Sequence, residues 1–117
     1  MRTEDLKLRT KQFALRVIKL VEILPKNKIG DVLGKQILRS ATSVEANYRT
    51  ACRARSKADF ISKIAIVEEE ADESLFWLEL ITESGLISAE RLKDLTKEAD
   101  ELTAIFTATG KTAKQNR

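Results

Sequence analysis

The chain has 117 residues, the size of one domain, and its 43% hydrophobic and 33% charged residues exclude an intrinsically disordered protein. The formal net charge of +3 is too small to indicate a partner, and the single cysteine, Cys52, excludes an internal disulfide and fits a reducing compartment. Residues 1–5 lead into no signal-peptide pattern, and no run approaches the roughly 18 apolar residues of a membrane span. We therefore expect a cytoplasmic protein without a membrane partner.

Four segments with helical periodicity follow one another along the chain. The first is predicted at about residues 4–24, where large apolar residues recur three, four or seven apart, and Pro25 ends it because proline cannot continue the hydrogen-bond ladder. The second is predicted at about residues 28–53, although Gly30 and Gly34 weaken its first turns by about 1 kcal/mol each. Its expected buried stripe consists of Ile29, Leu33, Ile37, Ala41, Val44, Tyr48 and Ala51.

The third and fourth helices have clear start signals. Ser56 is predicted to cap the third helix, which Gly85 ends, and Ser88 to cap the fourth, which Gly110 ends. The expected buried stripes are Phe60, Ile64, Val67, Ala71, Leu75, Leu78 and Ile81 in the third helix and Leu92, Leu95, Ala99, Leu102 and Ile105 in the fourth. We therefore divide the chain into a bundle domain, residues 1–110, and a basic tail, residues 111–117, that lacks large apolar residues and is expected to be disordered.

The connections between these helices are two to four residues long. Short links between long helices make sequential neighbours antiparallel. The sequence thus predicts an all-α fold, an antiparallel up-down four-helix bundle.

The third helix carries a second face besides its buried stripe. Ile66, Glu70, Glu73, Trp77 and Leu80 are spaced three or four apart, and the first helix is similarly wide. Because so much apolar surface is unfavourable in water, we expect self-association through an interface that contains Ile66, Trp77 and Leu80. The alternative is that Trp77 closes one end of the core of a single subunit.

Glu70 and Glu73 lie on that second face and need cationic partners if they are buried. In an antiparallel hairpin that turns near Arg55, Arg39 of the second helix lies about level with Ala71. We therefore predict a structural ion-pair layer of Arg39, Glu70 and Glu73, within a subunit or between subunits. The alternative is an ordinary solvated acidic face.

The residue patterns of enzymes are missing. Glu70 and Glu73 are spaced as in carboxylate-bridged metal sites, but those sites also use histidine, and the chain has none. Cys52 and the hydroxyl residues lack an activating base, and no glycine-rich phosphate loop opens a helix. We predict no catalytic residue, no metal and no cofactor, and hence a non-enzymatic protein. A carboxylate metal enzyme is a further alternative.

Basic residues surround the turn between the second and third helices. Residues 46–58 contain Arg49, Arg53, Arg55 and Lys57 and no acid. Such cations can neutralise the phosphates of RNA or DNA without reading sequence, and the basic residues of the tail could add a mobile arm. Two alternatives stay open: these cations are simply solvated, or the protein is an adaptor whose acidic third helix docks a basic protein partner.

Three motifs occur in order at characteristic separations, namely QILRSATSVEANY at residues 36–48, SKADFI at residues 56–61 and ESLFWLEL at residues 73–80. They resemble the bacterial four helix bundle protein family, which is encoded in intervening sequences of 23S ribosomal RNA genes, and the similarity covers about residues 5–106. The chain departs from the commoner pattern of that family, because Thr50-Ala51 and Glu69-Glu70 replace its Glu-Gly and Gly-Ser pairs.

The resemblance implies an antiparallel bundle that assembles as a ring-like homopentamer with a central channel. It also implies a relationship to the accessory protein of diversity-generating retroelements, a basic protein that binds a reverse transcriptase and nucleic acid. Most members of the family have no known molecular function. The resemblance therefore favours a homo-oligomeric scaffold or binding protein without naming its ligand.

Overall fold

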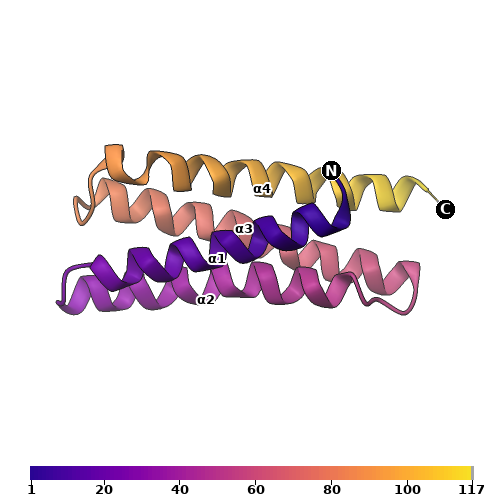
Figure 1. Ribbon diagram of the computed structural model, residues 1–117, viewed down its shortest axis with the longest axis horizontal. Coiled ribbons are helices and arrows are strands. Elements are labelled where there is room, and N and C mark those ends of the chain that lie inside the picture. The colour runs from indigo at the N-terminus through magenta and orange to yellow at the C-terminus, as the bar shows by residue number, and fades with distance from the viewer. Residues whose placement is uncertain (117) are drawn as a thin grey trace.

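Four helices account for nearly all of residues 1–116, the part of the chain that the computed structural model describes. They are α1 (Thr3–Ile23), α2 (Lys28–Ala51), α3 (Lys57–Glu83) and α4 (Ala89–Gln115), and the described residues form no strand. Consecutive helices run antiparallel and pack in chain order into a rod of 48 × 21 × 19 Å (Figure 1). The predicted all-α fold with four helices is confirmed.

Side-chain caps fix where three of the helices begin. Asn27, Ser56 and Ser88 each accept a hydrogen bond from the backbone N–H three residues further on, at 2.8, 3.0 and 3.3 Å. Each such bond satisfies a backbone donor that has no partner inside the helix. The predicted caps Ser56 and Ser88 are confirmed.

The core runs along the rod axis and draws on all four helices. Most predicted stripe residues lie in it; Phe60, Leu75 and Ile105 are only half-buried against it, and Ile29 lies outside it. Ile29 is 60% exposed because it lies on the outer side of the first turn of α2, and Phe106 rather than Ile105 is fully buried because it continues the i, i+4 spacing of Leu102. The largest fully buried side chains are Phe13, Val17, Ile37, Val44, Ile64, Val67, Leu78, Ile81, Leu102 and Phe106.

Helix α4 continues past Gly110 to Gln115. The predicted exit at Gly110 is therefore wrong, and so is the predicted disorder of residues 111–115; Arg117 lies outside the described residues. Gly110 is buried against Ile64 of α3, and Thr112 and Ala113 line a hollow with Phe60. The first turns of α3 thus extend beyond Gly110 and support the last turns of α4.

The two ends of the rod differ in what they hold. The start of α1, the end of α4 and the turn between α2 and α3 lie towards one end, whereas the other two turns lie at the opposite end (Figure 1). None of the described helices is long and apolar enough to cross a membrane.

Candidate functional site

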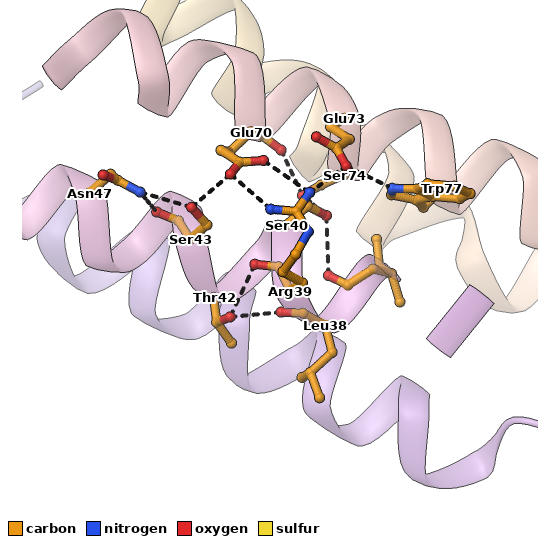
Figure 2. A network of polar contacts seen from close by, with 11 residues as sticks. Leu38, Arg39, Ser40, Thr42, Ser43, Asn47, Glu70, Glu73, Ser74 and Trp77 are labelled. Carbon is orange, nitrogen blue, oxygen red and sulfur yellow. Dashed lines mark hydrogen bonds and ion pairs between the residues drawn. The ribbon is translucent and has the colours of Figure 1, made fainter. Parts of the chain in front are cut away.

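Arg39 of α2 reaches across to α3 and contacts both carboxylates that the sequence analysis paired with it. Its guanidinium donates to Glu70 at 3.0 and 3.3 Å and also donates to Glu73 (Figure 2). Ser43 donates to Glu70 at 2.9 Å, and the indole of Trp77 donates to Glu73 at 3.2 Å. The hydrogen bond from Arg39 lowers the pKa of Glu73, and the two carboxylates raise the pKa of Arg39. These residues therefore form one network within a single subunit.

A second polar contact lies beneath this network. The hydroxyl oxygens of Ser40 and Ser74 are 2.9 Å apart and both side chains are fully buried between α2 and α3. Each serine can also donate to its own helix, to the carbonyl of Ile37 or of Glu70. The sequence analysis missed this pair, although both serines occupy positions on the buried stripes of their helices. Satisfied polar contacts between helices favour one register over its neighbours.

The predicted interface residues lie on the outward face of α2 and α3, around the network. Ile66 and Leu80 stand seven residues on either side of Glu73 and are 40% and 37% exposed. Trp77 is half-buried, and its ring packs edge-on against Phe76 at a centroid distance of 4.8 Å. Helical spacing puts Ile29 and Val32 of α2, which are both exposed, on this same side of the hairpin. We term the exposed apolar residues Ile29, Val32, Ile66, Phe76 and Leu80 the α2–α3 face.

The predicted nucleic-acid-binding residues are all exposed at one end of the rod. Arg49 lies in the last turn of α2, Arg53 and Arg55 lie in the following turn, and Lys57 begins α3. None of the four side chains forms an ion pair with a described residue. Because α4 stays helical to Gln115, Lys111 and Lys114 are carried to the same end on an ordered helix rather than on a mobile arm.

Arg9 of α1 makes a contact with α4 that sequence reasoning did not find. Its Nε and Nη2 atoms donate to the two carboxylate oxygens of Glu98, both at 2.7 Å, and Nη2 also donates to Glu101 at 2.8 Å. These hydrogen bonds raise the pKa of Arg9. The arginine and Glu98 side chains are only 22% and 16% exposed. A partly buried, two-pronged pair of this kind has a fixed geometry and links the first and last helices.

The remaining reactive groups form no recognisable centre. Cys52 is half-buried next to Tyr48, whose pKa is raised by its burial. Across residues 1–116, no group of three or more histidine, cysteine, aspartate or glutamate side chains is placed to hold a metal ion. The carboxylates of Glu70 and Glu73, which the sequence spaces like metal ligands, are engaged by Arg39.

Comparisons with known proteins agree with this architecture. The chain superimposes with a TM-score of 0.87 on the crystal structure of a protein of unknown function from the S23 ribosomal protein family of Bacteroides thetaiotaomicron. The two are 35% identical, and the match covers 95% of this chain and 99% of that one. No curated protein matches the chain.

Residues 4–108 match the family described as 23S rRNA-intervening sequence protein. The match includes the whole of α2 and α3, where the three sequence motifs lie, and it extends over most of α1 and α4. The chain therefore belongs to the 23S rRNA-intervening sequence protein family.

Proposed function

We propose that this protein is a non-enzymatic, homo-oligomeric helical scaffold that binds RNA or DNA at one end of its bundle. The observation that supports this most directly is the charge of that end. Residues 1–11, 46–59 and 107–116, which lie towards that end, contain ten cations and three acids, whereas residues 22–35 and 79–94, at the opposite end, contain five cations and six acids. We term Arg49, Arg53, Arg55, Lys57, Lys111 and Lys114 the basic end.

Phosphates are the natural ligands of such a surface. The side chains of Arg49, Arg53, Arg55 and Lys57 are exposed and form no ion pair within the described chain, although the backbone N–H of Arg55 donates to the nearby carboxylate of Asp59 at 3.3 Å. A polyanion therefore meets these side chains without first breaking an ion pair. Binding then releases the counterions that surround the nucleic acid and depends steeply on salt. Among the described residues near the basic end, Tyr48 is buried, Phe60 is half-buried and no aromatic ring is exposed to stack on bases, so the expected binding is independent of sequence.

Self-association is the second part of the proposal. The α2–α3 face leaves Ile29, Val32 and Phe76 each more than half exposed, which is unfavourable in a lone subunit. A ring of three or more subunits needs two different faces, and α1 offers the second one with Leu15 and Ile18 at 53% and 38% exposed. The ring-like homopentamer implied by the family resemblance would bring several basic ends together and so strengthen binding through multivalency.

An adaptor for a basic protein is the second candidate. Glu69, Asp72, Glu79 and Glu83 are exposed along α3 and form no ion pair with a described residue. A basic partner could dock on these acids whether or not the opposite cations bind nucleic acid.

One experiment separates these possibilities: light scattering coupled to gel filtration, with and without an RNA or DNA oligonucleotide. The protein should elute at a multiple of 13.2 kDa and should co-elute with the oligonucleotide at low salt. About four phosphate contacts should lose roughly a hundredfold in affinity over a fourfold rise in salt. Replacing Phe76 by Glu should dissociate the oligomer while circular dichroism still reports a folded helical protein.

A charge-matched pair of variants isolates the basic end. Glutamine at Arg49, Arg53, Arg55 and Lys57 should abolish co-elution, whereas glutamine at Lys26, Lys28, Arg91 and Lys93, at the opposite end, should preserve it. A particle of one chain's mass at micromolar concentration would disprove the scaffold. An oligomer that retains neither RNA nor DNA would disprove nucleic-acid binding and favour the adaptor.

A further inference from the structure

A hollow of about 420 Å³ lies between α1 and α2 next to the basic end. Two pairs of cations line it, one from each helix: Lys7 and Lys11 from α1, and Arg49 and Arg53 from α2 and the turn that follows it. Lys7 and Lys11 are four apart, so their side chains emerge on the same side of α1, whereas Arg49 in the last turn of α2 and Arg53 in the following turn line the opposite wall. The hollow is therefore a groove with a row of positive charge on each wall.

We propose that this groove, which we term the α1–α2 groove, is the track that holds the phosphate backbone of bound nucleic acid. The inference rests on the proposed function and makes it specific. It assigns Lys7 and Lys11, which the sequence pattern did not single out, to the binding surface. Of the four residues that the sequence analysis predicted to bind nucleic acid, it keeps Arg49 and Arg53 on the binding surface. It leaves out Arg55 and Lys57, which do not line the groove.

The charges in the groove are available to a ligand. Lys11, Arg49 and Arg53 form no ion pair with a described residue, and Lys7 pairs only with Glu4 in the preceding turn, at 3.5 Å. The side chains of that pair are 41% and 79% exposed, and such surface pairs contribute little to stability. A phosphate can therefore replace Glu4 as the partner of Lys7 with little loss.

Two acids also line the groove, and they set a limit on its affinity. Glu4 and Glu45 oppose the four cations, so the lining has a net charge of +2. Glu45 is half-buried on α2 and pairs with no cation in the described chain, so it repels an incoming phosphate. Removing its charge should strengthen binding, an effect of the opposite sign to that of removing a lysine.

The bottom of the groove is not built for reading bases. Tyr48 is among its lining residues, but the residue is only 4% exposed and its ring packs on Phe106 at a centroid distance of 5.2 Å. Stacking of a base on this ring would require the core to open. The groove therefore suits the backbone that RNA and DNA share, and it should bind different base sequences equally.

Fluorescence anisotropy with labelled single-stranded RNA and DNA of the same sequence tests the groove. Three double variants each remove two charges: Lys7→Gln with Lys11→Gln, Arg49→Gln with Arg53→Gln, and Arg55→Gln with Lys57→Gln. The first two should each weaken binding about tenfold and lower the slope of log affinity against log salt by roughly two. The third should behave like a Lys26→Gln, Lys28→Gln control from the opposite end, and Glu45→Gln should tighten binding.

The failure of this inference differs from the failure of the proposed function. If the lysine pair of α1 behaves like the control while the Arg55 and Lys57 pair loses affinity, phosphates bind at the tip of the hairpin and the groove proposal is wrong. If the wild-type protein binds neither oligonucleotide at low salt, nucleic-acid binding itself is wrong. Melting curves of each variant by circular dichroism establish that the exposed substitutions leave the bundle folded.

Discussion

Glu73 lies between two donors, the guanidinium of Arg39 and the indole of Trp77. The bond from Arg39 lowers the pKa of this carboxyl below the ordinary value of about 4.3. A carboxyl whose pKa is lower in the folded than in the unfolded state adds stability that is fully present above the unfolded-state pKa. That contribution disappears as the pH falls through the folded-state pKa.

The Glu73→Gln variant should therefore be less stable than the wild type at neutral pH, and the difference should vanish in acid. Denaturant unfolding at a series of pH values measures this, with the change expected below about pH 4.3. The effect should be modest, since the Glu73 side chain is 38% exposed and solvent screens its pair. Glu69→Gln, at an exposed position without an ion pair, is the matched control. Parallel pH profiles for Glu73→Gln and the wild type would contradict the prediction.

Residue-level contacts differed in how far the sequence could predict them. The meeting of Arg39 with Glu70 and Glu73 follows from the register of a tight antiparallel hairpin, and charge made the three residues conspicuous. The buried Ser40–Ser74 contact had no such signal, because a serine on an apolar stripe does not reveal whether a second serine faces it. Ile105 and Phe106 lie three and four residues after Leu102, so both fit a helical spacing, and the alternation of three and four along the stripe continues at Phe106, the residue that is buried.

Two glycines show how far the local sequence predicts where a helix ends. Gly85 was predicted to end α3, and its φ of +82° is the left-handed conformation that favours glycine there. Gly110 was expected to do the same for α4, but it lies inside the helix. Nothing in the local sequence separates the two, since the helix continues only because α3 extends beyond Gly110 and covers it.

Two alanine substitutions should therefore have opposite effects. At Gly110 a new Cβ would lie 3.5 Å from Ile64, an ordinary contact, so alanine should stabilise the protein by roughly 0.5–1 kcal/mol through its higher helix propensity. At Gly30 the Cβ would lie 2.1 Å from the carbonyl oxygen of Pro25, and the α1–α2 turn would have to move. We expect Gly30→Ala to destabilise by roughly 1–3 kcal/mol.

Urea unfolding of both variants measures these changes, with helix content from circular dichroism as a check on the native state. The Gly110 variant also tests the extent of α4, because an alanine outside the helix would gain nothing from helix propensity. A loss of stability at Gly110, or none at Gly30, would contradict the packing described for these two positions.

For the molecule as a whole, the seam between α1 and α4 is the part least determined by chain order. Short turns make sequential helices neighbours, and the sequence therefore predicted three of the helix pairs. The contact between the first and last helices depends on residues far apart in the chain, and α1 meets α4 less extensively than it meets α2. Arg9 and Glu98 join that seam across 89 positions of sequence, a distance over which no local pattern is informative.

Arg9→Gln should weaken this closure of the bundle. The variant leaves Glu98, which is only 16% exposed, without its cation, and this should lower the free energy of unfolding by roughly 1–2 kcal/mol, between the values of surface and buried pairs. Amide hydrogen exchange should accelerate in α1 more than in α2 or α3, because α1 loses its ion pair to α4 and is then held by core packing alone on that side. Arg16→Gln removes the same charge from an exposed site on α1 and should change neither quantity. Equal effects of the two substitutions would mean that net charge, rather than the contact between Arg9 and Glu98, controls the stability of the seam.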